Sequence, residues 1–369
     1  MANDLRILLL SRYGQLGASS RMRFYQFIPA LEAAGARIDV SPLLDDDYLV
    51  RRYTGNAVKA SRLIAVYVRR VARLLARFRY DLVWLEGEAF PWLPAWLETL
   101  TRGSGAPLVV DYDDALFHRY DRHRSALVRA AFGRKIDGIM RSARLVTVGS
   151  PYVAERARRA GARWIEQLPT AADAARYRIK GDAAAGVFTV GWIGSPLNAR
   201  YLELVRRPLQ RLAEIVPLRI LLIGAPPGTL QGLPVEVRPW SSEREADDLL
   251  SADVGIMPLY DDSWERGKSG YKLIQYMAAG LPAVATPVGV NKTIIGAETT
   301  GFLAASDDDW VDALTKLARR PDLRRHMGAA GRAKFERLYS LQATAPKLVE
   351  LMRKAAASSG SGAICPLDE

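Results

Sequence analysis

A run of glycine and lysine residues in the second half of the chain has the chemistry of an anion-binding site. Gly267 and Gly270 bracket Lys268 and Ser269, and the apolar periodicity of a helix begins directly afterwards. The first amides of a helix lack partners within it, and the helix dipole adds positive potential there, so such a loop attracts anions. Lys268 and Lys272 add point charges. The segment therefore predicts phosphate binding.

Carboxylates directly follow two predicted strands in the first half of the chain. Glu86 and Glu88 follow one of them, and Asp113 and Asp114 follow the next. Ligands of open α/β sheets bind outside the carboxyl ends of the strands, so these side chains are candidates for contacts with ligand hydroxyl groups. The alternative for the aspartates is capping of the next helix, and for the glutamates a purely structural role.

Alternating strand and helix patterns position these residues. Short apolar runs separated by amphipathic stretches are typical of a parallel sheet with helices on both faces, which places the chain in the α/β class. The scheme occurs twice, and the periodicity fades between the halves, in 170–186. Helices are expected at 56–79, 124–142 and 198–215, among others. The predicted strands are 5–10, 36–40, 82–85, 108–111, 145–148, 188–193, 219–223, 235–237, 254–258 and 283–285.

Length and composition exclude several classes of protein. The chain has 369 residues, of which 49% are hydrophobic and 25% charged, as in an ordinary globular protein with two domains. The only cysteine, Cys365, cannot form an internal disulfide, and with three histidines it gives no metal-binding spacing. Neither a leader nor a membrane-spanning run is expected. We therefore expect a cytoplasmic protein without a bound metal.

Basic charge gathers in the first half. Residues 1–170 hold 27 Lys and Arg against 17 Asp and Glu, a net charge of +10 out of +12 for the chain. No acidic residue occurs from Tyr48 to Tyr80. Either this segment is a sheet-packing helix with a charged outer face, or residues 51–79 contact an anionic membrane surface. No nucleic-acid motif accompanies the charge, so nucleic acid is not an expected partner. Apolar residues at positions 64, 67, 68, 71, 74, 75 and 78 form one predicted stripe.

The segment 264–291 resembles the donor-binding signature of family-four retaining glycosyltransferases, which have the GT-B fold of two facing Rossmann-like domains. The resemblance implies an N-terminal acceptor domain (1–170) and a C-terminal nucleotide-sugar donor domain (171–340). It also implies a last helix (341–356) that packs back toward the first domain, before a disordered tail (357–369). Further matching motifs are Gly17-Ala18-Ser19-Ser20-Arg21, Asp111-Tyr112-Asp113-Asp114-Ala115, Gly191-Trp192-Ile193-Gly194-Ser195, Gly301-Phe302-Leu303, Met327-Gly328 and Tyr339-Ser340.

The resemblance implies transfer of a sugar from a UDP- or GDP-linked donor, with retained configuration. The basic first half of the chain, and not the resemblance, predicts that the acceptor is lipid-linked or another surface glycan. This places the protein in cell-envelope polysaccharide biosynthesis, on the inner face of the membrane, with no cofactor besides the co-substrate. Fixed cations would stabilise the charge that develops on the departing diphosphate. The implied catalytic residues are Asp113, Asp114, Lys268 and Lys272. The implied donor-binding residues are Gly17, Gly194, Ser195, Arg200, Trp240, Ser269, Gly270, Tyr271 and Gln275. The implied acceptor-binding residues are Ser19, Arg21, Glu86 and Glu88.

Four residues have two interpretations each. Arg21 and Arg23 face an anionic acceptor, or they form the solvated face of a helix. Trp240 follows a predicted strand and borders the nucleotide base, or it packs as a core or surface tryptophan. His118 follows the two aspartates closely enough to reach the ligand crevice, or it serves the structure only.

The sequence departs from the family pattern at the donor site. The family has two glutamates with seven residues between them, whereas here Gln275 holds the second position, Gly267 the first, and Glu265 lies two residues early. Ser195 stands where the family has an arginine, and Arg200 lies near the position of its lysine. A non-catalytic sugar-nucleotide-binding protein with a degenerate site therefore remains an alternative. A dinucleotide-dependent oxidoreductase would need a Gly-x-Gly-x-x-Gly loop, which the first glycine loop lacks.

Overall fold

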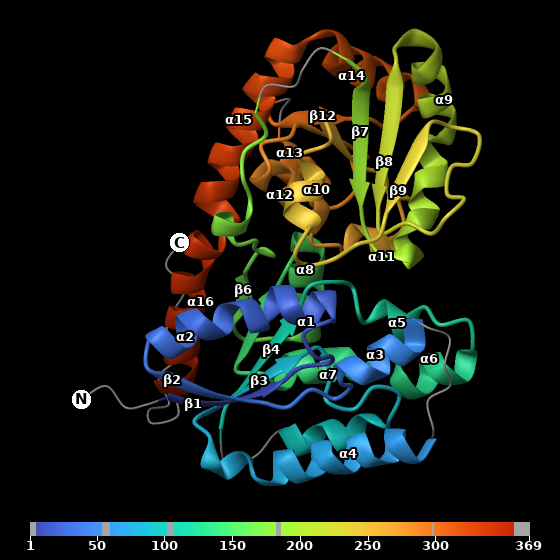
Figure 1. The fold of residues 1–369 in the computed structure, drawn as a ribbon. Coiled ribbons are helices and arrows are strands. Elements are labelled where there is room, and N and C mark those ends of the chain that lie inside the picture. Colours follow the sequence, from blue (N-terminus) through green and yellow to red (C-terminus); the bar gives the residue numbers. More distant parts are fainter. Residues whose placement is uncertain (1–4, 54–59, 102–105, 182–185, 297–298, 358–369) are drawn as a thin grey trace. The chain divides into compact units, whose positions relative to one another are not determined.

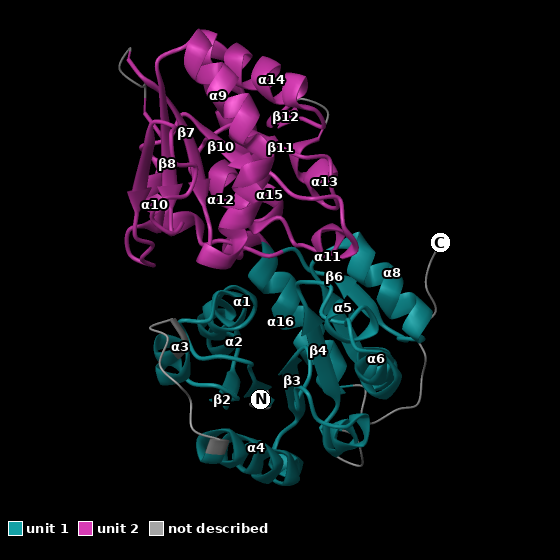
Figure 2. Ribbon diagram, turned by 90° about the vertical axis from the view of Figure 1, so that its right-hand side faces the viewer, with its two compact units in different colours: residues 1–169, 344–369 teal, residues 170–343 magenta. Residues whose placement is uncertain are grey.

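The computed structural model describes residues 5–53, 60–101, 106–181, 186–296 and 299–357 (Figure 1). The chain divides into two compact units, which Figure 2 shows in different colours. Unit 1 comprises residues 1–169 and 344–369, and unit 2 comprises residues 170–343. Within the described ranges, none of the helices has the length and apolar character needed to cross a bilayer. Most of the predicted tail, 358–369, lies outside the described residues.

Unit 1 is built on a six-stranded sheet in the order β2-β1-β3-β4-β5-β6, with every pair parallel. The inner strands are continuous apolar runs because helices cover both of their faces; Ile7 to Leu10, for example, are fully buried. The strands are β1 (Leu5–Leu10), β2 (Ala36–Val40), β3 (Leu82–Glu86), β4 (Leu108–Tyr112), β5 (Leu145–Val148) and β6 (Ile165–Gln167).

The helices of unit 1 come from both ends of the chain. The last helix, α16 (Leu341–Ala357), joins this unit from Thr344 onward, and its Lys347 forms an ion pair of 3.2 Å with Glu166. The other helices are α1 (Ala18–Arg23), η1 (Tyr25–Phe27), α2 (Ile28–Ala33), α3 (Asp46–Tyr53), α4 (Ala60–Leu75), η2 (Arg77–Arg79), η3 (Ala95–Thr101), α5 (His118–Asp121), α6 (Ala126–Phe132), α7 (Lys135–Ser142) and α8 (Pro151–Ala160).

Unit 2 repeats this plan with the parallel order β12-β11-β10-β7-β8-β9. Its strands are β7 (Phe188–Ile193), β8 (Leu218–Ile223), β9 (Val235–Arg238), β10 (Val254–Met257), β11 (Ala283–Ala285) and β12 (Gly301–Leu303). Its helices are η4 (Ala174–Arg176), η5 (Pro196–Val205), α9 (Arg206–Ile215), α10 (Glu245–Leu249), α11 (Ser263–Arg266), α12 (Tyr271–Ala278), α13 (Asn291–Ile295), α14 (Asp307–Arg319) and α15 (Pro321–Leu338).

Both sheets have a topological switch point beside their first strand. In unit 1 the chain adds β2 on one side of β1 and β3 on the other, and in unit 2 it adds β8 and β10 on opposite sides of β7. Ligands of such sheets bind where the strand order reverses, outside the carboxyl ends of the strands. The predicted α/β class is confirmed in both units, and each unit offers one crevice position.

Several predicted helices differ from the observed ones. Residues 198–215 are not one helix but η5 followed by α9, because Pro208 near the start of α9 cannot donate the backbone hydrogen bond that would join them. Residues 124–142 form α6 and α7, which are separated at Gly133–Arg134. Of the helix predicted at 56–79, residues 56–59 lie outside the described residues, and the α-helix ends at Leu75.

Candidate functional site

The switch point of unit 1 holds a buried carboxyl group. Glu86 ends β3, and its Oε2 accepts hydrogen bonds from the Ser20 hydroxyl at 2.6 Å and from the Arg12 backbone amide at 2.7 Å. Burial raises the pKa of the Glu86 carboxyl to about 7, although both hydrogen bonds act in the opposite direction. Glu86 therefore joins the loop after β1 to β3 through a group that titrates near neutral pH.

A second carboxylate lies against the neighbouring serine of α1. The Ser19 hydroxyl donates to Asp113 Oδ2 at 2.7 Å, and both side chains are half-buried. The predicted residues Ser19, Glu86 and Asp113 are thus brought together at the carboxyl edge of the sheet. Asp114, next in the chain, is also half-buried. Oxygen atoms in this arrangement suit the hydroxyl groups of a polar ligand.

The glycine loop before α1 is shaped by packing. Gly17 precedes α1 with φ of −72°, so its backbone does not require glycine. A Cβ atom on Gly17 would lie 2.4 Å from Cβ of Tyr13, which leaves no room for a side chain. Arg21 is half-buried, and its guanidinium donates to the backbone oxygen of Gln15 at 3.3 Å. The role of Arg21 toward an acceptor stays a prediction.

Arg23, in contrast, points into the interior. Its side chain is 1% exposed, and its Nε and Nη2 contact the Asp111 carboxylate at 2.8 and 2.5 Å. Its Nη1 donates to the backbone oxygen of Leu168 at 2.7 Å. Such a bidentate pair orders α1 against β4. The interpretation that Arg23 faces an anionic ligand is therefore wrong.

Glu88 is also part of the interior. Its buried carboxylate pairs with Lys135 Nζ at 3.0 Å and accepts hydrogen bonds of 2.8 and 2.9 Å from the Tyr120 hydroxyl. Lys135 in turn pairs with Glu98 at 3.1 Å. The structure contradicts the prediction that Glu88 contacts an acceptor, because this network already satisfies the carboxylate. The counter-ion of Glu88 is Lys135, which lies 47 positions further along the chain. No pattern in the sequence near Glu88 indicates this partner.

His118 likewise serves the structure. Its Nδ1 contacts Asp121 at 2.7 Å and its Nε2 contacts the Tyr152 hydroxyl at 2.8 Å. Burial lowers the pKa of this imidazole, although the contact with Asp121 opposes the shift. Both ring nitrogens are thus occupied by protein groups, which favours the structural interpretation of His118.

In unit 2, Lys272 lies beside the loop that follows β7. Its Nζ is 5.7 Å from the centre of the Trp192 ring, within the range of a cation–π contact. A Cβ atom on Gly194 would approach Lys272 Cε to 2.9 Å, so glycine makes room for the lysine there. Ser195 follows in an exposed position at the start of η5. The structure thus brings Gly194 and Lys272 together at the switch point of the second sheet.

The N-terminus of α12 has the features that the sequence predicts for an anion site. Gly270 precedes it with φ of +73°, a backbone conformation that favours glycine, and the helix receives no side-chain cap. The helix dipole adds positive potential at this end, where no capping side chain is placed. Lys268 lies on the preceding loop with its Nζ 5.8 Å from the centre of the Tyr201 ring. Ser269 and Tyr271 flank Gly270 and are half-buried.

Arg200 contacts Glu265, a buried residue that lies two positions before the family's first glutamate. Glu265 accepts a hydrogen bond from the Tyr201 hydroxyl, and its Oε1 lies 3.1 Å from Arg200 Nη2. Burial raises the pKa of the Tyr201 hydroxyl to about 12, so this hydroxyl remains a donor at neutral pH. The Arg200 side chain is 64% exposed despite this contact. The charge of Arg200 is thus partly balanced by Glu265.

Gln275 belongs to a buried chain of hydrogen bonds. Its Nε2 donates to the Tyr177 hydroxyl at 3.1 Å, and that hydroxyl lies 3.5 Å from Glu245 Oε1. Trp240 Nε1 donates to Glu245 Oε2 at 2.9 Å. Burial raises the pKa of Tyr177 above its ordinary range. Two predicted residues, Gln275 and Trp240, are therefore joined through Tyr177 and Glu245, which sequence analysis missed because they lie 98 and 30 positions from Gln275.

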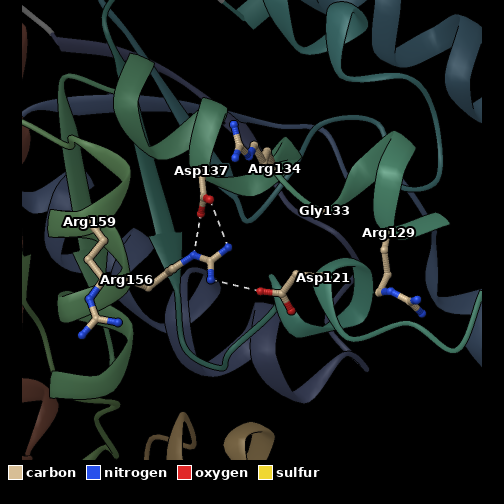
Figure 3. Close-up of a pocket in the computed structure, with 7 residues that line it drawn as sticks. All are labelled: Asp121, Arg129, Gly133, Arg134, Asp137, Arg156 and Arg159. Atoms are coloured by element: carbon tan, nitrogen blue, oxygen red, sulfur yellow. Dashed lines mark hydrogen bonds and ion pairs between the residues drawn. The ribbon is translucent and has the colours of Figure 1, made fainter. Parts of the chain in front are cut away.

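The pocket in Figure 3 is separate from these residues. It has a volume of about 420 Å³ and lies among the helices of unit 1. Its central Arg156 forms ion pairs with Asp121 at 3.0 Å and with Asp137 at 2.6 Å, as the dashed lines show. None of the predicted site residues lines it. Within the described parts of the chain, no cluster of three or more His, Cys, Asp or Glu suits a metal ion.

Comparison with known proteins identifies both units. A family model described as "Glycosyl transferase 4-like domain" matches residues 16–169, and one described as "Glycosyl transferases group 1" matches residues 186–320. D-inositol 3-phosphate glycosyltransferase of Rhodococcus erythropolis is 27% identical over 228 residues, which cover 54% of this chain and 50% of that protein. The enzyme of the same name from Streptomyces scabiei is 32% identical over 38% of this chain and 33% of its own length. The chain thus aligns with half or less of these relatives.

Solved structures share the fold at low sequence identity. Sucrose-phosphate synthase from Thermosynechococcus elongatus has a TM-score of 0.73 at 18% identity, with 96% of this chain and 100% of that chain covered. Anabaena HepE, in complex with UDP and glucose, has a TM-score of 0.70 at 14% identity, covering 95% and 99%. WaaG, a glycosyltransferase involved in lipopolysaccharide biosynthesis, has a TM-score of 0.66 at 14% identity, covering 94% and 99%.

Proposed function

We propose, from the premise that the chain belongs to the GT-B glycosyltransferases, that it transfers a sugar from a nucleotide diphosphate sugar to an acceptor hydroxyl group. The donor is UDP- or GDP-linked and binds to unit 2, and the acceptor binds to unit 1. No further cofactor takes part in the proposal. HepE, one of the structural neighbours, was solved with UDP and with UDP-glucose, which supports this class of donor.

One observation carries the proposal: two lysines and an uncapped helix end meet the glycine loop at the switch point of unit 2. Lys272 lies against Gly194, Lys268 lies on the loop before Gly270, and α12 begins there without a side-chain cap. Backbone amides and ammonium groups in this arrangement form a site for a diphosphate. The carboxamide of Gln275, one turn inside α12, takes the place of the family's second glutamate toward the ribose.

The chemistry follows from the charge that develops during transfer. When the bond between the sugar and the phosphate breaks, negative charge grows on the departing nucleoside diphosphate. Fixed cations and amides aimed at that charge stabilise the transition state more than the ground state. In the proposed route a phosphate oxygen of the leaving group takes the proton of the acceptor hydroxyl, which then attacks the same face of the sugar. The anomeric configuration is retained, and no strong general base is required.

The acceptor side of the proposal rests on unit 1. The Ser19 hydroxyl donates to the Asp113 carboxylate, and the hydroxyl of the next residue, Ser20, donates to Glu86. With Asp114 and Arg21, these groups would orient a sugar hydroxyl. We further propose a lipid-linked or surface-glycan acceptor in cell-envelope polysaccharide biosynthesis, reached from the cytoplasmic face of the membrane. The strongly basic first half of the chain supports an anionic surface as a neighbour.

The alternative of a non-catalytic nucleotide-sugar-binding protein is not favoured. Its motivation was the replacement of the family's glutamate and arginine by Gln275 and Ser195. Unit 2 nevertheless keeps Lys268 and Lys272 at the glycine loop, and Arg200 remains largely exposed beside them. These cations would stabilise the charge that develops when the sugar–phosphate bond breaks.

Ligand-dependent thermal stability tests the proposal. Purified protein is heated with UDP, GDP, ADP, CMP or NAD, because a ligand that binds only the folded state raises the midpoint. We expect a rise with UDP or GDP that is lost in Lys272→Ala and kept in Lys316→Ala, which removes a lysine from α14. A rise with NAD alone, or an undiminished rise in Lys272→Ala, would contradict the proposed donor site. The protein is then incubated with sugar conjugates of the nucleotide that raises the thermal midpoint. NMR of the product reports the anomeric configuration.

A further inference from the structure

One side of α4 carries large apolar side chains that are largely exposed in the part of the chain that the structure describes. Ile64, Val68 and Leu75 are 65%, 63% and 61% exposed, and Phe78 in the following turn is 69% exposed. At about 100° per residue, positions 64, 68 and 75 fall within about 40° of one another on the helix surface. In Figures 1 and 2, α4 is the outermost layer of unit 1 on its side. The apolar stripe therefore faces away from the core.

The opposite side of α4 is fixed against the unit. Val66 and Leu74 are buried, and buried Arg70 donates from Nη2 to the backbone oxygen of Ser11 at 2.8 Å. The Tyr67 hydroxyl donates to the backbone oxygen of Pro91 at 2.7 Å. These contacts determine which residues face outward. The single stripe predicted from the sequence is thus two stripes: positions 67, 71 and 74 pack inward, and positions 64, 68, 75 and 78 are exposed.

Basic side chains flank the apolar stripe. Arg69 and Arg73 are exposed on the side of α4 about 100° to 140° away from Val68. The small exposed residues Ala65 and Ala72 lie between the apolar stripe and these two arginines. Arg62 continues the basic flank, but it is paired at 2.9 Å with Asp45 and also with Asp47. Arg69 Nη2 donates to the backbone oxygen of Pro42 at 3.3 Å, a contact that does not neutralise its charge. The helix itself contains no acidic residue, so Arg69 and Arg73 place two positive charges beside the apolar side chains.

We propose that this face of α4 docks the protein on the surface of an anionic lipid bilayer. The helix has 16 residues and is about 24 Å long, and it would lie in the plane of the interface. Ile64, Val68, Leu75 and Phe78 enter the boundary between headgroups and acyl chains. Arg69 and Arg73 remain at the level of the lipid phosphates. The biological role of this docking, which is to bring unit 1 to a lipid-linked acceptor, rests on the proposed function. The docking itself does not.

The pairing of the two kinds of side chain favours a bilayer over other partners. A nucleic-acid surface would use the arginines but would leave three exposed aliphatic side chains in water. A second copy of the chain would bury the aliphatic side chains but would also bring Arg69 and Arg73 toward an equally basic unit. A bilayer with anionic headgroups satisfies both sets at once, because apolar and phosphate layers lie side by side in it.

Vesicle co-sedimentation tests the proposal with two sets of variants. The apolar set is Ile64→Gln, Val68→Gln and Leu75→Gln combined; glutamine keeps the helix, since its helix propensity is at least as good as that of valine or isoleucine. The charge set is Arg69→Gln with Arg73→Gln. The matched controls are Leu127→Gln, which removes an exposed apolar side chain from α6, and Arg144→Gln with Arg163→Gln, which removes two exposed charges from the same unit.

We expect the wild-type protein to bind vesicles containing phosphatidylglycerol and to bind pure phosphatidylcholine vesicles far more weakly. The charge set should weaken binding about 25-fold at low salt, since each basic residue at the surface contributes about 1 kcal/mol. The difference should shrink toward 0.5 M salt because the Debye length falls. The apolar set should weaken binding at least about tenfold at every salt concentration. The two control sets should bind as the wild type does, apart from a small loss with the arginine pair.

Three results would overturn the proposal. They are a wild-type protein that does not bind anionic vesicles, equal losses in the α4 sets and their controls, and a wild-type dimer in solution that the apolar set converts to a monomer. The nucleotide-induced thermal shift is measured on the same samples. A shift that persists while vesicle binding is absent refutes the docking surface alone, whereas vesicle binding without any nucleotide shift refutes the proposed donor site and leaves the docking surface standing.

Discussion

Replacement of Glu86 by glutamine should remove a pH-dependent loss of stability. The Glu86 carboxyl is buried at the end of β3, where burial raises its pKa from 4.5 to about 7. In the unfolded chain the same group releases its proton near its ordinary pKa. Between pH 4.5 and 7 the folded state therefore binds more protons than the unfolded state, and the free energy of unfolding falls as the pH rises.

The size of this effect follows from the two pKa values. With 4.5 in the unfolded and about 7 in the folded state, the contribution of Glu86 to the free energy of unfolding drops by about 2.5 kcal/mol between pH 5 and pH 8. Glutamine has nearly the same shape, and its carbonyl oxygen can accept from the Ser20 hydroxyl and the Arg12 amide as Oε2 does. Glu86→Gln should therefore lack the drop without losing these two hydrogen bonds.

Urea unfolding at pH 5 and pH 8 measures the difference. Relative to the wild type, Glu86→Gln should gain about 2.5 kcal/mol on going from pH 5 to pH 8. Glu214→Gln, which removes an exposed carboxyl from α9, controls for the loss of one negative charge. A wild type and Glu86→Gln whose free energies of unfolding change in parallel with pH would refute the reasoning, because the carboxyl would then be ionised in the folded state throughout.

Three further predictions concern single side chains. Lys268→Ala and Lys272→Ala should each lower kcat/KM for sugar transfer about 100-fold, because a fixed cation at the leaving diphosphate is lost; transfer at the wild-type rate by both would remove them from the site. Gly270→Ala should lower the free energy of unfolding by about 2–4 kcal/mol in urea, since alanine is strained at φ of +73° and its Cβ would meet α13; an unchanged midpoint would contradict that geometry. Arg23→Ala should cost about 3–5 kcal/mol by the same assay, because Asp111 is left buried without its counter-ion; a loss below about 1 kcal/mol would mean that water reaches the carboxylate.

The fold was predictable because the strands are continuous apolar runs. Each of the ten predicted strands appears in the sheets, since runs such as 5–10 and 188–193 are buried on both faces and have no other stable position. The strands that were missed, β6 and β12, have three residues each and lie at sheet edges. Such short segments acquire their conformation from the neighbouring strand, so their own sequences carry little signal.

The site was predictable where neighbours in sequence are also neighbours in space. Gly270 and Lys272 belong to one segment, and the structure keeps them together at the start of α12. Glu88 failed as a ligand contact because its partner, Lys135, lies far along the chain, and one sequence does not reveal a buried ion pair of that kind. For the same reason the sequence could not show that Tyr177 joins Gln275 to Glu245.

The two faces of α4 illustrate a further limit. Positions 64 to 78 repeat at helical spacing whether they pack on a sheet or on a lipid surface. The burial of Val66 and Leu74 and the contacts of Arg70 with Ser11 and of Tyr67 with Pro91 show which residues face inward. The periodicity of the sequence thus predicts the helix but not which of its apolar side chains face the core.

Transfer of labelled sugar tests the central claim most directly. Wild-type protein and the combined Lys268→Ala, Lys272→Ala variant are incubated with membrane extract and a panel of radiolabelled UDP- and GDP-linked sugars, and label in the lipid-extractable or polysaccharide fraction is counted. We predict that the wild type transfers label from at least one donor and that the variant loses this transfer. Absence of transfer from every donor that raises the thermal midpoint, or equal transfer by both proteins, would contradict a glycosyltransferase with its donor site at α12.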